Sequence, residues 1–385
     1  MNSCEYLFSV KIIFFSFSGM ENRFSSPSIW PLVFTTFIFG FVIFNFLPLK
    51  VLYLLLSGIG IVWGFLGWIF IKQLNMVFRE LVVSDLLRAA YSAGNRSIRE
   101  DSVPYCLPIW LPFLRPPSSD LPPKWILYLT AVTLGPLRAL GIFLILCCSA
   151  LACSCRASWG QPVYSFLGNC LNFLILWKFE VVGDIDEKCR GIVANHSSVI
   201  DEHVLWMLGR RIVWVAKEEV KKIPLMGMIC KSIGSIFVDR RSEAGRLKAV
   251  EEIKAFLLSS KTGFPLLVVF PEGTCSNSLF LLPFKPTAFS TGVYMQPAAI
   301  SISNPHAAFA LNDSSLIHAA LLFSLPTLSI RIDLLPAVIT AEEARASISK
   351  AAEIPLAPEG EGAVRGWPEL SKYVKKLMRD SGLKL

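Results

Sequence analysis

The hydrophobic residues of this chain are concentrated in its N-terminal half, where they form long runs that carry few charges. Between residues 29 and 71 the only charged residue is Lys50. A membrane-crossing helix needs about 20 consecutive apolar residues, so this run is long enough for two helices, over residues 30–48 and 51–71. A cleaved signal peptide is a poorer fit, because it has one short apolar core followed by small residues. The pattern predicts an N-terminal transmembrane hairpin over residues 1–72.

Two further apolar stretches follow a more polar segment. Residues 73–124 mix charges with many prolines and predict a linker. Residues 125–152 are apolar again but contain a Gly-Pro pair and Arg138. Because an ionisable group is costly within a bilayer, we expect a kinked, partly buried or interfacial element there. Residues 164–177 suit an amphipathic helix lying on the bilayer, so residues 125–178 are predicted to be membrane-associated helices.

From about residue 179 the pattern changes to short apolar runs that alternate with helical periodicity. Leu247, Val250, Ile253 and Leu257 recur at helical spacing, with charged residues between them. Alternating strands and helices indicate an α/β domain, which we expect to be a mixed sheet flanked by helices. Residues 179–385 are therefore predicted to form a catalytic domain. The candidate strands are residues 191–194, 213–216, 235–238, 266–270, 296–303 and 328–334.

The formal net charge of +8 favours a negatively charged partner. The basic residues accompany long apolar runs, and the chain has neither zinc-finger spacing nor a basic strand rich in aromatic residues. A lipid bilayer or a phosphorylated substrate is therefore favoured, and no nucleic acid partner is expected. The ten cysteines lack the regular spacing of a disulfide framework, and no metal site is predicted. Palmitoylation of the cluster at residues 147–155 remains an open alternative to simple free thiols.

The first candidate for chemistry is the heptapeptide NHSSVID at residues 195–201, which directly follows a candidate strand. His196 is one of four histidines, and an ordinary imidazole pKa of ~6.5 suits it to take a proton from a hydroxyl. Asp201 could orient the ring and stabilise its protonated form. The alternative is structural: Ser197 or Ser198 caps a helix, and Asp201 complements the helix N-terminus.

The second candidate is the turn FPEGT at residues 270–274, which ends another apolar strand. A glycine-bearing turn can offer backbone N–H groups, and Thr274 adds a hydroxyl, to an oxyanion or a phosphate. An ordinary strand-ending turn is the alternative.

The third candidate is GSIFVDRR at residues 234–241, a short strand that delivers Arg240 and Arg241. The planar guanidinium group is suited to hold a phosphate. Several lysines upstream could deepen the positive field, although a solvated helix face is the favoured interpretation of them.

Taken together, these blocks resemble the acyl-CoA-dependent glycerolipid acyltransferase family. NHxxxxD, GxxFVDR and FPEGT occur in that family's order, followed by a proline-containing strand at residues 293–300. The resemblance covers about residues 125–340 and implies that His196 is the general base and Asp201 its orienting partner. It also implies that Arg240 and the Glu272-Gly273-Thr274 turn bind the substrates. Since Glu272 would repel phosphate, we expect it to pair with a basic residue or hold the loop.

The branch of the family is less sharply defined. EGTCSN at residues 272–277, FKPTAF at residues 284–289 and LGPLR at residues 134–138 resemble the lysophosphatidylcholine acyltransferases. In contrast, VDR at residues 238–240 is more similar to the lysophosphatidate acyltransferases.

The expected activity is therefore acyl transfer from acyl-CoA, as co-substrate, to a lysophospholipid acceptor, with no bound cofactor. Two alternatives stay open: an enzyme acting on lysophosphatidate or glycerol 3-phosphate, and a non-catalytic lipid-binding or scaffold protein. The expected location is an integral membrane protein of the endoplasmic reticulum.

Overall fold

The computed structural model describes residues 49–92, 114–155, 159–174, 177–206, 208–259, 265–277, 279–310 and 314–357. The chain divides into two compact units, Met1–Val62 and Trp63–Leu385. The second unit contains the sheet and the described helices that follow α3 (Leu49–Ser92) in the chain. The first helix of the expected hairpin, residues 30–48, lies outside the described residues, so the hairpin stays a prediction.

The second unit is built on a seven-stranded sheet with the order β1-β7-β6-β2-β5-β3-β4. All neighbouring strands are parallel except β6 and β7, which confirms the expected mixed sheet. Six strands match the expected runs to within one or two residues, whereas β1 was not predicted. The strands are β1 (Trp177–Val182), β2 (Gly191–Ala194), β3 (Ile212–Lys217), β4 (Ile236–Val238), β5 (Leu266–Val269), β6 (Met295–Ile302) and β7 (Leu328–Leu334).

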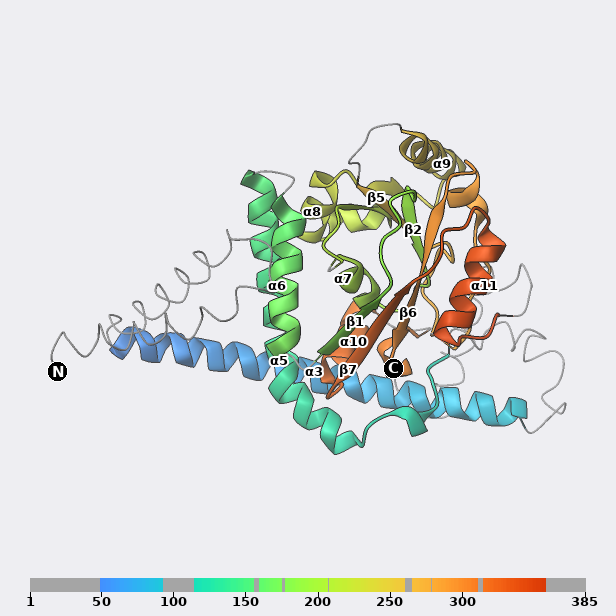
Figure 1. Cartoon of the computed structure of the whole chain (residues 1–385). Helices are drawn as coiled ribbons and strands as arrows, with labels where there is room; N and C mark the ends of the chain where they lie inside the picture. The colour runs from blue at the N-terminus through green and yellow to red at the C-terminus, as the bar shows by residue number, and fades with distance from the viewer. Residues whose placement is uncertain are drawn as a thin grey trace, which may run out of the picture. The chain divides into compact units, whose positions relative to one another are not determined.

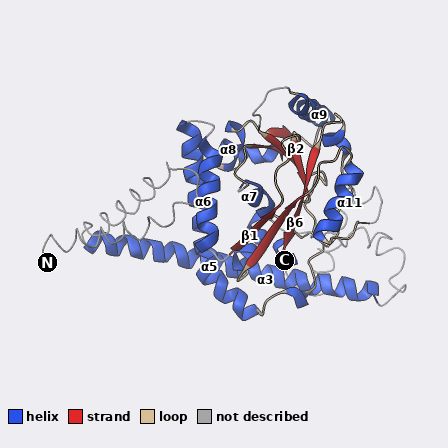
Figure 2. Cartoon of the chain, viewed as in Figure 1, coloured by secondary structure: helices blue, strands red, loops and turns tan. Residues whose placement is uncertain are grey.

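The sheet separates two hydrophobic cores, because successive side chains of a strand point to opposite faces. In β2, Ile192 and Ala194 join one core and Val193 joins the other. Helices cover both faces (Figures 1 and 2). Helices α5, α6, α7, α8 and α10 contribute to the first core or lie against it, and α9 and α11 flank the second. The helices after α3 are α5 (Lys124–Cys155), α6 (Gly160–Leu174), α7 (Ile200–Trp206), α8 (Met226–Ser232), α9 (Glu243–Leu258), α10 (Ser315–Ser324) and α11 (Ala341–Ala352), with 3-10 turns η2 (Ser118–Asp120), η4 (Glu218–Lys222), η5 (Pro286–Phe289) and η6 (Pro305–Ala307).

Helix α3 (Leu49–Ser92) is longer than the hydropathy pattern indicated. The expected helix ended at residue 71, but the chain stays helical through the first part of the segment predicted to be a linker. The reason is a buried stripe at helical spacing: Leu74, Val77 and Leu81 are almost fully buried in the first core. Within α3, Ser57–Val82 is long and apolar enough to cross a membrane, judged by length and composition.

Helix α5 is continuous through Pro136, so no break of the helix occurs at the Gly-Pro pair. Gly135 allows close packing against α3, because a Cβ at this position would overlap the Phe70 ring. Arg138 is fully buried, which agrees with the expectation that this segment is partly buried in the protein. Its guanidinium donates to the carbonyl oxygens of Phe323 (2.7 Å), Leu325 and Pro326 (2.9 Å), at the C-terminal end of α10. The arginine therefore satisfies carbonyls that the end of a helix leaves without partners.

Two local expectations were wrong. Leu247 was placed on the buried stripe of α9, but its side chain is 59% exposed, and Ala249 takes its place beside Ile253 and Leu257. The segment 164–177 does not end as a surface helix: α6 stops at Leu174, and Trp177 is buried at the start of β1. At the other end of the segment, Tyr164 is buried against α7, where its ring packs on Trp206 at 4.3 Å.

Candidate active site

The candidate site lies where two neighbouring parallel strands end. Strands β2 and β5 pair in parallel, so the loops that follow Ala194 and Val269 emerge from the same edge of the sheet. His196 lies in the first loop and Glu272 in the second. Substrates of open α/β sheets bind at this carboxyl edge.

His196 and Asp201 lie in direct contact. The Nδ1 atom of His196 is 3.1 Å from Oδ2 of Asp201, a carboxylate that is fully buried in the first turn of α7. The same oxygen accepts hydrogen bonds from the backbone N–H groups of Ser197 (2.6 Å) and Ser198 (2.8 Å). Asp201 thus holds both the ring and the loop that carries it, so the structural and chemical interpretations of this residue apply together.

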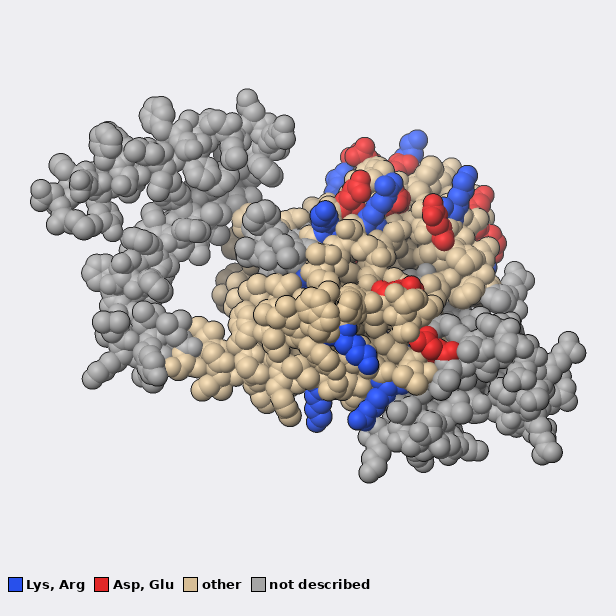
Figure 3. Space-filling view, turned by 90° about the horizontal axis from the view of Figure 1, so that it is seen from below, with Lys and Arg blue, Asp and Glu red and all other residues tan. Residues whose placement is uncertain are grey.

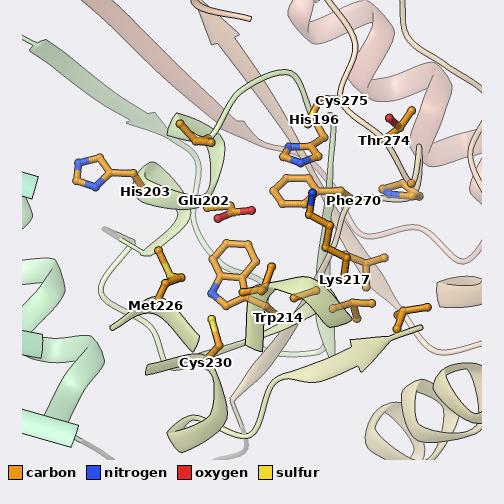
Figure 4. A pocket seen from close by; sticks show the side chains of 18 of the residues that line it. His196, Glu202, His203, Trp214, Lys217, Met226, Cys230, Phe270, Thr274 and Cys275 are labelled. Carbon is orange, nitrogen blue, oxygen red and sulfur yellow. The ribbon is translucent and has the colours of Figure 1, made fainter. Parts of the chain in front are cut away.

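The imidazole of His196 is fixed from its flat side as well. It stacks on Phe270, with ring centroids 4.0 Å apart and planes 13° apart, and Phe270 stacks in turn on Trp214. Burial alone would lower the pKa of the ring. The Cys275 sulfur and the Asp201 carboxylate act in the opposite direction and outweigh burial, so the pKa of His196 lies well above its ordinary value. Figure 4 shows Cys275 beside His196.

Glu272 faces the protein instead of the open space. Its carboxylate accepts from the backbone N–H groups of His196 (2.7 Å) and Leu282 (3.0 Å), and the residue is only 2% exposed. Burial raises the pKa of Glu272 to about 7, against the lowering effect of these two hydrogen bonds. Ser276 N–H also donates to the His196 carbonyl (3.0 Å). Of the two roles expected for Glu272, the geometry fits the one that holds the loop. Glu272 does so through backbone groups, and no Lys or Arg among the described residues forms an ion pair with it.

Gly273 and Arg240 meet beside this loop. Gly273 has a φ of +71°, which favours glycine, and its carbonyl accepts from Arg240 Nη1 at 2.5 Å. A Cβ on Gly273 would overlap the Lys285 ammonium, so Lys285 lies close against the turn. The pKa of Lys285 is lowered by burial and by the nearby Arg240.

A cavity of about 880 Å³ lies beside the two loops. His196, Arg240, Gly273 and Thr274 all contribute to its wall, whereas Asp201 and Glu272 lie behind it. Four cationic side chains line the cavity: Lys217, Arg240, Arg246 and Lys285. Its other walls are largely apolar and reach helices α5, α6 and α10 through Ile142, Leu146, Tyr164, Leu322 and Phe323. The cavity therefore joins a cationic end, a histidine and an apolar end.

Several lining residues were not singled out in the sequence. Lys217 was interpreted as part of a solvated helix face, yet it lines the cavity at the end of β3. Lys285 lies in the segment FKPTAF at residues 284–289, which served only to distinguish between branches of the resembled family. Glu202 and Trp214 carried no recognisable signal, although Glu202 directly follows Asp201 in the sequence.

The three other histidines are buried in packed surroundings. The Nδ1 atom of His203 lies 2.7 Å from the Tyr164 hydroxyl, His306 Nε2 lies 2.9 Å from the Pro117 carbonyl, and His318 Nε2 lies 2.9 Å from Ser198 Oγ. His196 has the Asp201 carboxylate as a partner and a place on the cavity wall. Among the described residues, no three His, Cys, Asp or Glu side chains come together as a metal site would require.

Comparison with known proteins finds similarity over the part of the chain that carries the site. Residues 189–301 match the family model described as Acyltransferase, a range that includes every site residue named from the sequence. Lysophosphatidylcholine acyltransferase 1 of Danio rerio is 42% identical over 112 residues, which cover 29% of this chain and 21% of the relative. Lysophosphatidylcholine acyltransferase 2 of Rattus norvegicus is 27% identical over 235 residues, which cover 55% of this chain and 43% of the relative. The matches thus span less than half of these relatives' own length.

Among solved structures, the 1-acyl-sn-glycerophosphate acyltransferase PlsC from Thermotoga maritima aligns with 56% of this chain and 81% of its own chain. The identity is 21% and the TM-score 0.38, a level that does not by itself establish a shared fold.

Proposed function

We propose that this chain belongs to the glycerolipid acyltransferase family and transfers a fatty acyl group from acyl-CoA to the free hydroxyl of a lysophospholipid. The observation that carries the proposal is the His196–Asp201 contact on the wall of a cavity with one cationic and one apolar end. Both substrates combine phosphate groups with an acyl chain, so a cavity of this kind suits them. The names of the similar proteins support the choice of a lysophospholipid as acceptor.

In the proposed reaction, His196 acts as the general base. Asp201 holds Nδ1, which leaves Nε2 to accept the proton of the acceptor hydroxyl. The oxygen then attacks the thioester carbonyl, and the C–S bond breaks as the tetrahedral intermediate collapses. The imidazolium returns its proton to the departing CoA thiolate, and Asp201 stabilises the imidazolium in between. The Thr274 hydroxyl, on the cavity wall, is placed to stabilise developing negative charge.

Arg240 and its neighbours bind the phosphate groups in this proposal. One guanidinium nitrogen of Arg240 is used to hold Gly273, and a guanidinium carries five N–H donors. Lys285 and Lys217 add positive charge on the same cavity wall. Glu272 contributes by fixing the loop, through its bonds to the His196 and Leu282 backbones.

The membrane location is a second part of the proposal. Helix α5 is long and apolar enough to cross a bilayer by length and composition, and two of its residues, Ile142 and Leu146, line the apolar end of the cavity. Large apolar side chains on α5, such as Trp125, Phe143 and Leu151, are exposed. On the face seen in Figure 3, much of the surface between the charged margins carries no charge. A bilayer against α5 would let acyl chains enter the cavity directly from lipid. Transfer of an acyl chain into water costs about 0.8 kcal/mol per CH₂, and this route avoids that cost.

The experiment is a transfer assay with radiolabelled acyl-CoA and a panel of lysolipids, on the full chain in membranes. Labelled diacyl phospholipid that depends on His196 supports the proposal. Label that appears only with lysophosphatidate or glycerol 3-phosphate supports the alternative acceptors, and acceptor binding without transfer supports a lipid-binding protein. Fractionation against marker proteins of the endoplasmic reticulum tests the proposed compartment.

A further inference from the structure

The cavity contains one acidic side chain among the described residues that line it. Glu202 follows Asp201 on α7, and Figure 4 shows its carboxylate pointing into the cavity. The other charged residues of the wall, apart from the histidines, are all cationic: Lys217, Arg240, Arg246 and Lys285. In a cavity that bound only phosphate groups, a carboxylate would weaken the binding, because like charges repel.

Glu202 is not neutralised by a salt bridge. Lys217 is near enough to favour the ionised form of Glu202 electrostatically, but among the described residues no Lys or Arg forms an ion pair with this carboxylate. The carboxylate is half-buried. Burial raises the pKa of Glu202, with smaller opposing contributions from His196 and Lys217. A ligand cation beside it would restore the charged form.

Aromatic rings lie on the cavity wall beside Glu202, where Figure 4 shows Trp214 and Phe270. Trp206 and Trp214 have ring centroids 6.1 Å apart, and Trp214 stacks on Phe270 at 5.9 Å. All three rings line the cavity. Aromatic faces attract cations, and such rings beside a carboxylate are a recurring way to hold an ammonium group in a partly desolvated site.

We infer that Glu202 and the aromatic wall of Trp206, Trp214 and Phe270 form a subsite for the ammonium group of a zwitterionic lysophospholipid headgroup. The inference rests on the proposed function and adds the class of acceptor to it. Lysophosphatidate and glycerol 3-phosphate contain phosphate but no cationic group, so the cavity offers them an uncompensated carboxylate. A headgroup that joins a phosphate to an ammonium matches both the basic residues and Glu202.

The test is a comparison of four lysolipids with the same acyl chain: lysophosphatidylcholine, lysophosphatidylethanolamine, lysophosphatidylglycerol and lysophosphatidate. The wild-type kcat/KM should be roughly tenfold higher for the two zwitterionic acceptors than for the two others, as expected for a partly desolvated cation site. Glu202→Gln keeps the shape and removes the charge, so it should raise KM for the zwitterionic acceptors and abolish the preference. The KM for acyl-CoA should stay unchanged. Glu202→Asp should keep the preference, and Glu187→Gln, at an exposed position away from the cavity, is the matched control.

A measurement on the wild-type protein covers the case in which Glu202→Gln does not fold. Phosphocholine should compete with the lysolipid acceptor more strongly than glycerol 3-phosphate does. Equal loss for all four acceptors in Glu202→Gln, or equal competition by the two phosphates, would overturn the cation subsite while leaving acyl transfer intact. If the wild-type chain acylates none of the four acceptors, the proposed function itself fails, and the subsite fails with it.

Discussion

Two histidines lie on the described part of the cavity wall, and the contrast between them shows how neighbours decide what one residue type can do. At the sheet edge, His196 contacts the Asp201 carboxylate, and its pKa is raised well above the ordinary value. Toward α6, His203 contacts the neutral Tyr164 hydroxyl, and burial lowers its pKa to about 4. Both rings line the cavity. The first can exchange a proton and be stabilised in its charged form, whereas the second stays neutral near pH 7.

The largest expected effect comes from removing the base. His196→Ala should reduce acyl transfer by roughly 10²–10⁴-fold, the usual contribution of general acid–base catalysis, because it removes the imidazole that lies on the cavity wall in contact with the Asp201 carboxylate. The measurement is kcat with saturating acyl-CoA and lysolipid, on protein recovered from membranes at wild-type yield. Near-normal turnover of the variant would remove His196 from the mechanism.

Removing the carboxylate should have the second-largest effect. Asp201→Asn leaves the imidazole in place but loses its orienting partner, so we expect a loss of roughly tenfold to a hundredfold, smaller than that of His196→Ala. The variant also weakens the bonds to Ser197 and Ser198 N–H, so thermal stability should be measured beside activity.

The pH dependence of the rate separates the effect of Asp201 on the His196 imidazole from its effect on the stability of the loop. A general base must be neutral to accept a proton, so wild-type transfer should fall as the pH drops through the raised pKa of His196. Asp201→Asn removes one of the groups that raise this pKa. The acid limb of its pH–rate profile should therefore move to lower pH, even though the maximal rate is smaller. An acid limb at the same pH in both proteins would show that another group controls it.

A smaller and more selective effect is expected at the cationic end. Arg240→Ala should raise the KM for the lysolipid about tenfold, as expected for a lost charge-assisted hydrogen bond, with less effect on the KM for acyl-CoA. Arg241→Ala, whose exposed side chain pairs with Glu219 on the surface, is the control. Equal losses for both substrates would indicate that Arg240 acts only by holding the Gly273 turn.

The smallest effect should come from the second histidine. His203→Gln retains a hydrogen-bonding partner for the Tyr164 hydroxyl, so we expect a loss of at most about threefold and an unchanged acid limb in the pH profile. A large loss of activity, or a shifted acid limb, would mean that His203 takes part in the chemistry and is not only a packing residue.

Sequence reasoning identified the elements whose local pattern is strong. The strands at residues 191–194 and 266–270 are short, apolar and followed by turn residues, so the loops that carry His196 and Glu272 could be located. Parallel pairing of β2 with β5 then brings the loops together, which no local pattern shows. Strand β1 was missed because Lys178 and Glu180 interrupt its apolar run and most of its side chains are exposed.

The direction of a side chain was harder to predict than its position. Glu272 was expected either to pair with a basic residue or to hold the loop, and only the structure shows that its carboxylate turns inward to backbone N–H groups, an orientation that depends on the loop at Leu282. Leu247 satisfied the helical spacing yet lies on the exposed side of α9, and Ala249 is the residue that is buried beside Ile253 and Leu257. Lys285 and Glu202 reach the cavity through tertiary packing alone, so their part in the site could only be seen in three dimensions.

The bonds of Arg138 to the end of α10 have a consequence for how the protein is made. The carbonyl groups that accept from Arg138 are supplied by residues 323, 325 and 326, which leave the ribosome long after α5. During that interval a membrane-inserted α5 would carry a charge without its final partners, at a cost of a few kcal/mol near the bilayer centre. For an α5 that spans the bilayer as proposed, full insertion would therefore be coupled to completion of the sheet domain. A nascent chain that stops before α10 should leave such an α5 loosely held.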